Sequence, residues 1–251
     1  MPRLQAVFWD VDGTLADTEM EGHRPAFNQA FEELGLPWHW NRTLYQQLLA
    51  IPGGGQRMAF FAEQQGHPLN PEALEQLKQV KQSHYLARIR SGAVCLRPGV
   101  ARLLNELRAA GVRQWIVTSS GRASVEALME GLFPGAANPF EGSISANDVQ
   151  RHKPHPDPYL HALNSSGAAA NRCLAVEDSA AGLTAAVRAS MPCLVTPSLW
   201  DQQLPKEIHR AAAVVDHLGE HHQPLTQTSG PPCVDGLITL EYLQLLLETS
   251  G

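Results

Sequence analysis

Hydrophobic residues along the chain form two kinds of pattern. Short continuous apolar runs, each followed by polar residues, are typical of buried strands in a parallel sheet. They occupy residues 6–9, 114–118, 143–145, 173–176 and 192–196. Stretches with apolar residues at three-to-four spacing, such as 99–110 and 180–190, lie between them and are typical of amphipathic helices. This alternation predicts an α/β fold, a Rossmann-like parallel sheet with helices on both faces.

One segment departs from the alternation and contains only helical patterns. These cover residues 25–34, 42–49, 56–65 and 72–89, and Gly/Pro-rich turns at 35–37, 52–55 and 66–68 separate them. We therefore predict a helical cap domain, residues 18–92, inserted into a core domain made of residues 1–17 and 93–251. Linkers at 16–18 and 91–96 would join the two, and paired linkers allow the cap to move as a lid.

The end of the chain carries a weaker pattern. Residues 221–232 are polar and rich in proline and glycine, which predicts a loop, and residues 237–248 carry a last helical pattern.

Composition narrows the function classes. The net charge of -6 and the pI of about 6.0 argue against a nucleic-acid partner. Four scattered cysteines without a CxxC pair favour reduced thiols, and the first strand follows the start without a signal segment, so we expect a cytoplasmic protein. No apolar stretch approaches the roughly 20 residues that span a membrane. The lack of a large apolar surface stripe favours a monomer.

The candidate chemistry begins directly after the first apolar run, at Asp10-Val11-Asp12-Gly13-Thr14. Side chains alternate along a strand, so Asp10 and Asp12 share one side of its carboxyl end. Two carboxylates so placed suit a hard cation and an acid/base pair. The structural alternative is a strand that ends in a solvated acidic turn.

Polar groups also follow other predicted strands. Thr118 and Ser119 precede a helix, where a hydroxyl and free N–H groups can hold a phosphate or simply cap the helix. Lys153 lies among prolines that stiffen its backbone, so it can neutralise a phosphoryl group or lie on the surface. Glu177 and Asp178 form a second acidic pair, either a metal site or an acidic helix start.

Together these residues resemble the four motifs of the haloacid-dehalogenase superfamily, in order and in approximate spacing, and the helical insert resembles that superfamily's cap. The resemblance implies a phosphatase in which Asp10 is the nucleophile that forms an aspartyl-phosphate and Asp12 is the general acid and base. Thr118, Ser119 and Lys153 would hold the phosphate. The implied cofactor is Mg²⁺, with four implied ligands: Asp10, Asp12, Glu177 and Asp178.

A closer resemblance is to the CbbY subgroup of sugar phosphatases. It rests on residues 17–28, the Trp38-His39-Trp40 stretch, the Gly53-Gly54 turn before Arg57, and residues 216–220. Members of that subgroup hydrolyse xylulose-1,5-bisphosphate, an inhibitor of the carbon-fixing carboxylase, to xylulose 5-phosphate and phosphate. The resemblance therefore implies this substrate. One departure is Gly55, which stands where related chains often carry a lysine and removes a cation near the distal phosphate.

Residues of the cap should select the substrate. We expect Arg57 to bind the distal phosphate, because a guanidinium binds phosphate bidentately. Sugar contacts are expected from Glu19, His23 and Gly54, with a structural role as the alternative for the first two. Tyr45 is a further candidate, although a helical tyrosine more often packs in a core. Trp38 and Trp40 are expected in the core of the cap.

Other functions stay open at this point. A phosphomutase resembling beta-phosphoglucomutase would use the same core and cap but would make an isomer with little net phosphate release. Phosphoglycolate or another small phosphomonoester is an alternative substrate. A non-catalytic binding module would be the alternative of another class, and the carboxylates of Asp10, Asp12, Glu177 and Asp178 argue against it.

Overall fold

The computed structural model describes residues 4–51, 53–135, 138–198, 200 and 206–249. Its sheet has the strand order β3-β2-β1-β4-β5-β6-β7, in which all neighbouring pairs are parallel except the antiparallel pair β6–β7. This order confirms the predicted Rossmann-like α/β fold. The strands are β1 (Ala6–Trp9), β2 (Arg113–Val117), β3 (Gly142–Ile144), β4 (Cys173–Glu177), β5 (Cys193–Val195), β6 (Ala213–Val215) and β7 (Gln227–Ser229).

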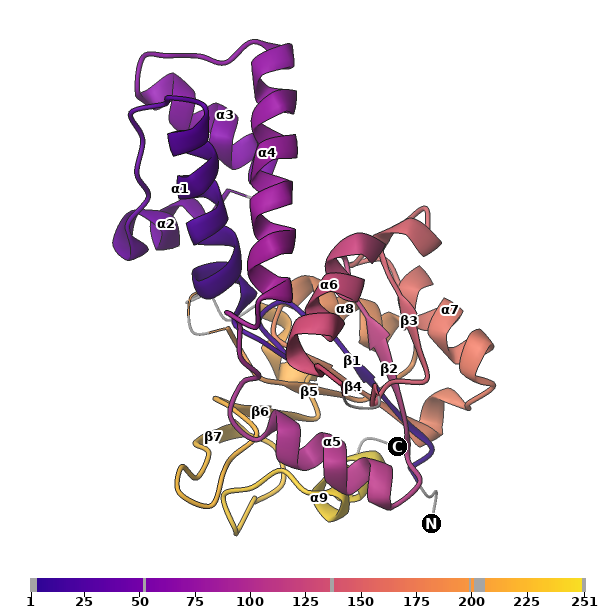
Figure 1. Ribbon diagram of the computed structural model, residues 1–251. Coiled ribbons are helices and arrows are strands. Elements are labelled where there is room, and N and C mark those ends of the chain that lie inside the picture. Colours follow the sequence, from indigo (N-terminus) through magenta and orange to yellow (C-terminus); the bar gives the residue numbers. More distant parts are fainter. Residues whose placement is uncertain (1–3, 52, 136–137, 199, 201–205, 250–251) are drawn as a thin grey trace.

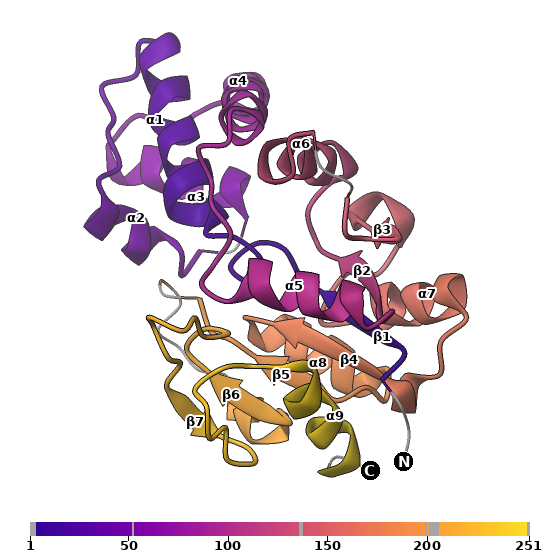
Figure 2. The ribbon, with the colours of Figure 1, turned by 60° about the horizontal axis from the view of Figure 1, so that its bottom comes forward.

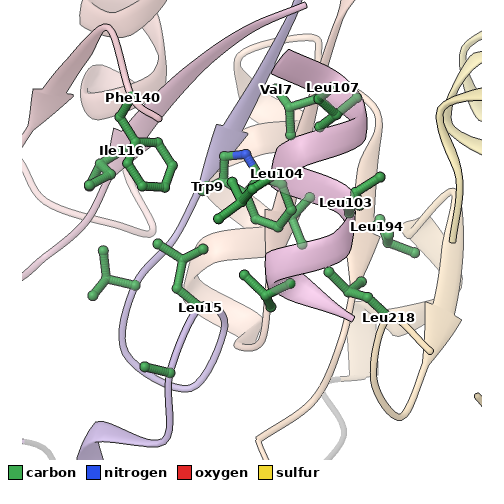
Figure 3. Packing of buried hydrophobic residues seen from close by; sticks show 14 of the residues in the cluster. Val7, Trp9, Leu15, Leu103, Leu104, Leu107, Ile116, Phe140, Leu194 and Leu218 are labelled. Carbon is green, nitrogen blue, oxygen red and sulfur yellow. The ribbon is translucent and has the colours of Figure 1, made fainter. Parts of the chain in front are cut away.

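The central strand β1 shows why the sheet is covered on both faces. Val7 and Trp9 lie in one hydrophobic cluster, whereas Ala6 and Phe8 lie in another, as the alternation of side chains requires. Helices α5 (Val100–Ala109) and α9 (Leu240–Thr249) cover the first face, and α7 (Asp157–Ser166) and α8 (Ala180–Arg188) cover the second (Figure 2). Figure 3 shows the α5 leucines packed against β1.

The segment after β1 forms a separate helical body at one end of the sheet (Figure 1). It contains a π-helix, η1 (Glu19–His23), and the helices α1 (Arg24–Glu33), α2 (Arg42–Leu48), α3 (Gly54–Gln64) and α4 (Pro71–Arg90). Phe27, Phe31, Trp38 and Trp40 are buried in its own hydrophobic cluster. The expectation that both tryptophans belong to the core of the cap is therefore confirmed.

The cap is joined to the core by more than its two chain connections. Ala16 pairs with Leu96 in an isolated antiparallel bridge, so the two linkers are hydrogen-bonded to each other. Trp200 of the core donates from Nε1 to Asp17 Oδ2 at 2.8 Å and packs against the cap cluster. Helix α4 also packs along α6 (Arg122–Leu132). These contacts fix where the cap lies over the sheet.

The carboxyl-terminal part contains more sheet than the sequence predicts. Residues 221–232 were expected to be a loop, but Gln227–Ser229 form β7 and pair with β6. The expectation was wrong because β7 is a polar edge strand, partly or fully exposed, and so leaves no apolar run. The short helices η2 (Ala146–Asp148), η3 (Ala170–Arg172) and η4 (Lys206–Arg210) complete the described elements. Within the described ranges, no helix is both long and apolar enough to cross a membrane.

Candidate active site

The predicted core residues meet at the carboxyl ends of β1, β2 and β4. Strand β1 lies between β2 and β4. Strands β2 and β3 extend the sheet on one side of β1, and β4 to β7 extend it on the other, so the strand order reverses at β1. In open parallel sheets such a switch point leaves a crevice for ligands. Asp10 follows β1 and its N–H donates to the Val176 carbonyl at 3.0 Å, which ties the two strand ends together.

Asp10 lies in a network of short contacts. Lys153 Nζ is 2.7 Å from Asp10 Oδ1, and Thr14 Oγ1 donates to Asp10 Oδ2 at 3.0 Å. The same ammonium also donates to the Val117 carbonyl at 2.7 Å. Burial alone would lower the pKa of Lys153, but the carboxylates of Asp10 and Glu177 outweigh it and raise that pKa. Lys153 is therefore a fixed positive charge beside Asp10.

Glu177 and Asp178 complete a carboxylate group around Asp10. Their oxygens and one of Asp10 lie within 4.8 Å of one another. Glu177 is fully buried, with Oε1 at 2.6 Å from Lys153 Nζ and bonded to the Tyr159 hydroxyl. Within the described part of the chain, Glu177 Oε2 is buried without a hydrogen-bond partner. Burial, followed by the charge of Asp10, raises the pKa of Asp178, and burial likewise raises that of Glu177.

This group fits a hard divalent cation. Mg²⁺ prefers carboxylate oxygens, and a cation would offset both the repulsion among three carboxylates and the unpaired state of Glu177 Oε2. Asp10, Glu177 and Asp178 are the side chains that would hold it.

Two glycines make this group sterically possible. A Cβ on Gly182 would lie 1.7 Å from Glu177 Oε2, and a Cβ on Gly13 would lie 2.0 Å from Asp178 Oδ2. Gly13 also has a φ of +86°, which favours glycine. Both carboxylates therefore lie directly against glycine backbone, and any larger residue at Gly13 or Gly182 would collide with them.

Asp12 is held apart from this group. Thr18 Oγ1 donates to Asp12 Oδ1 at 2.5 Å, and Ser120 Oγ donates to Oδ2. Both carboxylate oxygens of Asp12 are thus bonded to hydroxyls, and Asp12 is not among the carboxylates that gather around Asp10, so its predicted role as a metal ligand stays a prediction. Burial raises the pKa of Asp12, and the charge of Asp10 adds to that effect. A carboxyl group that binds its proton more tightly than usual suits a general acid.

The end of β2 presents hydroxyls with different orientations. Thr118 is buried, and its Oγ1 accepts from the Ser120 N–H at 3.1 Å. Ser119 is exposed, whereas Ser120 is half-buried and reaches Asp12. The chain bends at residues 119 and 120 after the end of β2, and this bend turns the Ser120 hydroxyl toward Asp12 and leaves Ser119 exposed. The structure thus brings Thr118 and Ser120 toward the site.

In the cap, Arg57 organises its neighbours. Its Nη1 donates to the Tyr45 hydroxyl at 2.9 Å, and Tyr45 in turn donates to Glu19 Oε2 at 2.5 Å. Arg57 also donates to the carbonyls of Leu48 at 3.0 Å and Ile51 at 3.4 Å. Tyr45 is fully buried and Arg57 is 6% exposed. The guanidinium therefore has protein partners on each of its nitrogens.

A second cap cation, Lys81, lies nearer the core. Its Nζ is 2.7 Å from His23 Nδ1 and 4.8 Å from the ring centroids of Phe27 and Tyr85. Burial lowers the pKa of Lys81 to about 8, although Glu19 and then Asp12 act in the opposite direction. Burial and the charge of Lys81 lower the pKa of His23 well below its usual value. His23 is thus neutral and accepts a hydrogen bond from Lys81.

A cavity of about 600 Å³ adjoins Lys81 in the cap. Gly54, the first residue of α3, lines it together with Gly55 and Phe27. The side-chain stem of Lys78 lies 3.5 Å from the place where a Gly55 Cβ would be. A lysine stem from α4 therefore occupies the space beside this glycine.

Sequence reasoning missed Lys81, Ser120 and Tyr159. The signal for Lys81 was present, since the buried positions of α4 are Leu77, Lys81, Tyr85 and Ile89, and a lysine in an apolar stripe at four-residue spacing is unusual. The only signal for Ser120 is its place directly after Thr118 and Ser119, in the run of hydroxyl residues that follows the second apolar run.

Comparison with known proteins gives a consistent result. The family model for haloacid dehalogenase-like hydrolases matches residues 4–190. The CbbY protein on a plasmid of Cupriavidus necator is 38% identical over 231 residues, which are 89% of this chain and 89% of that protein. CbbY of Rhodobacter capsulatus is 42% identical over 196 residues, 78% of this chain and 86% of that protein.

A solved structure is similar as well. It is that of a mutant of CbbY from Rhodobacter sphaeroides in complex with xylulose-(1,5)bisphosphate. The two chains are 34% identical with a TM-score of 0.73, and the match covers 85% of this chain and 94% of that one.

Proposed function

The chain belongs to the haloacid dehalogenase-like hydrolases, as a CbbY-like phosphatase, and we propose that it hydrolyses xylulose-1,5-bisphosphate to xylulose 5-phosphate and phosphate in a Mg²⁺-dependent reaction. The observation that carries this proposal is the carboxylate group of Asp10, Glu177 and Asp178 with Lys153 at 2.7 Å from Asp10, beneath a cap with a buried cation. The likeness to a CbbY that binds this bisphosphate supports the choice of substrate.

In the proposed first step, a carboxylate oxygen of Asp10 forms a bond to phosphorus while the bond from phosphorus to the sugar oxygen breaks. Asp12 gives its proton to the departing sugar oxygen, and its raised pKa keeps that proton available. Lys153 and Thr118 hold the non-bridging oxygens, since fixed donors stabilise the charge that develops there.

In the second step, ionised Asp12 takes a proton from water, and the hydroxide oxygen bonds to phosphorus as the aspartyl–phosphorus bond breaks. Phosphate leaves and Asp10 returns to a carboxylate. Dividing one displacement into two is the gain of a covalent intermediate. Mg²⁺ held by Asp10, Glu177 and Asp178 would screen the repulsion between the phosphate and Asp10.

The cap is proposed to recognise the remainder of the substrate. Lys81 and Arg57 are its buried cations, and an anionic distal phosphate is their natural complement. Because three of its five N–H groups already donate to Tyr45 and to two backbone carbonyls, we assign Arg57 chiefly to orienting Tyr45 and Glu19. Lys81, whose Nζ lies 2.7 Å from His23 Nδ1, is the cation proposed to contact the substrate.

The test is phosphate release, with and without Mg²⁺, from xylulose-1,5-bisphosphate, ribulose-1,5-bisphosphate, beta-glucose-1-phosphate and phosphoglycolate. We expect strong selectivity for the first compound, loss of release in EDTA and recovery with Mg²⁺. Equal, weak release from all four would reject the proposed substrate. Isomer formation without phosphate release would instead identify a phosphomutase.

The two cap cations can be separated by substitution. Arg57→Ala and Lys81→Met are each compared on the bisphosphate and on a small monophosphate. If the residue contacts the distal phosphate, its variant loses far more kcat/KM on the bisphosphate than on the monophosphate. Equal losses of kcat/KM on both compounds exclude such a contact.

A further inference from the structure

Arg97 lies where the second linker enters the core, and it binds no fewer than three separate loops. Its N–H donates to the Leu15 carbonyl at 2.8 Å, beside the Ala16–Leu96 bridge that joins the two linkers. Its side chain points inward, and the residue is 8% exposed. A buried arginine at this junction needs a structural reason, because burying an unpaired charge is costly.

Both terminal nitrogens of the Arg97 guanidinium donate to backbone carbonyls in the described structure. Nη1 donates to Gly13 and, at 2.8 Å, to Thr196, and Nη2 donates to Pro197 at 3.1 Å and Asp216 at 2.7 Å. These carbonyls belong to the loops that follow β1, β5 and β6. These four bonds use all four N–H groups of the two terminal nitrogens, so neither of these nitrogens is free to donate to a substrate.

The contact with Gly13 connects Arg97 to the reacting groups. Gly13 follows Asp12, and its backbone lies so close to Asp178 that a Cβ there would be 2.0 Å from Asp178 Oδ2. Asp178 is also the carboxylate whose charge acts most strongly on Arg97. A shift of the Gly13 carbonyl would thus move the loop that carries Asp10 and Asp12 relative to Asp178.

We propose that Arg97 is a positioning residue that sets the spacing between the loop carrying Asp10 and Asp12 and the carboxylate of Asp178. This inference rests on the proposed Mg²⁺-dependent reaction, because Asp10 and Asp178 are the residues proposed to hold the ion. Since Arg97 directly follows the second linker and its N–H donates to Leu15 beside the Ala16–Leu96 bridge, it also ties that spacing to the place where the cap joins the core.

The test is Arg97→Lys, which keeps the charge but cannot donate to four carbonyls in a planar fork. The matched control is Arg102→Lys. Arg102 belongs to α5 and also donates to backbone carbonyls, at 3.0 Å to Leu218 and 2.7 Å to Ile238, but none of them lies in the loop after β1. Mg²⁺ binding is measured directly by calorimetry, and kcat and KM are measured at saturating Mg²⁺.

We expect Arg97→Lys to bind Mg²⁺ more weakly by about 10- to 100-fold and to lose kcat by a similar factor, the range found when a hydrogen-bond partner of a metal ligand is changed, because Arg97 acts on the loop of Asp10 through Gly13. The KM for the ester should change much less, and Arg102→Lys should match the wild type in all three quantities. Unchanged Mg²⁺ binding in Arg97→Lys, or equal losses in both variants, would overturn the proposal.

Folding is checked by circular dichroism, and Arg97→Gln is measured in the same way if Arg97→Lys does not fold. If neither folds while Arg102→Lys does, Arg97 serves folding alone and the proposal fails. Absence of Mg²⁺ binding by the wild type would reject the proposed function itself, and this inference with it.

Discussion

Lys81→Met should make the protein more stable at pH 7 and a poorer enzyme. Methionine has a similar length without the charge, and it would lie against the rings of Phe27 and Tyr85 that now flank the ammonium. The pKa of Lys81 falls from 10.5 to about 8, with burial as the largest cause. At about 1.4 kcal/mol per pKa unit, this corresponds to about 3 kcal/mol that the folded state loses by keeping Lys81 protonated.

The sign and the pH window follow from proton linkage. Between pH 8 and 10.5 the unfolded chain keeps the Lys81 proton and the folded chain releases it, so the stability of the wild type rises with pH in this interval. The stabilising effect of Lys81→Met should therefore be largest below pH 8 and shrink above it. Allowing for imperfect packing of the new side chain and for the lost hydrogen bond to His23, we expect a gain of about 1–3 kcal/mol at pH 7.

The assay is urea unfolding of the wild type and Lys81→Met at pH 7 and pH 9.5, with KM measured at pH 7. Lys78→Met is the control, because Lys78 lies on the same helix, is 47% exposed and pairs with Glu75. Its substitution should change stability by no more than about 0.5 kcal/mol. A Lys81→Met protein that is less stable than the wild type at pH 7, or whose advantage is the same at both pH values, would refute the reasoning.

Three further substitutions test the site. Asp10→Asn should abolish turnover and leave the circular dichroism spectrum unchanged; steady turnover, once deamidation is excluded by mass spectrometry, would contradict its role as nucleophile. Gly182→Ala should displace Glu177, whose Oε2 would lie 1.7 Å from the new Cβ, and calorimetry should show lost Mg²⁺ binding; wild-type affinity would contradict this packing. Tyr45→Phe should lower the free energy of unfolding by about 1.5–3 kcal/mol, because Glu19 loses a hydrogen bond; a change below about 0.5 kcal/mol would show that this bond contributes nothing.

The fold and the core of the site could be predicted because parallel strands convert spacing along the chain into proximity. Apolar runs marked β1, β2, β4 and β5, and the residues just after β1 and β4 are brought together by strand pairing alone. Lys153 could be predicted as a member of this site from the motif around it, whereas hydrophobic periodicity gave no sign of it. The polar edge strand β7 has no apolar run, so only its pairing with β6 shows it to be a strand.

The contacts of the cap were beyond prediction for a different reason. Glu19 and His23 both belong to a π-helix, and nothing in the apolar spacing of residues 18–34 indicates this wider turn. The partner of His23, Lys81, lies 58 residues away on α4, and only helix packing brings the two side chains to 2.7 Å. Helix faces can be predicted from periodicity, but the rotation of one helix against another cannot.

This difference bears on where specificity lies. Arg57 stands in a recognisable motif, yet its nitrogens are already bonded to two carbonyls and to Tyr45, so it stabilises the cap whether or not a substrate is bound. Lys81 destabilises the folded chain by its burial and has His23 as its close side-chain partner. An anion that binds beside Lys81 offsets this loss of stability, because the attraction between ammonium and anion is strong in a buried site of low polarity. The residue least visible in the motifs is therefore the one on which recognition of the second phosphate should depend most.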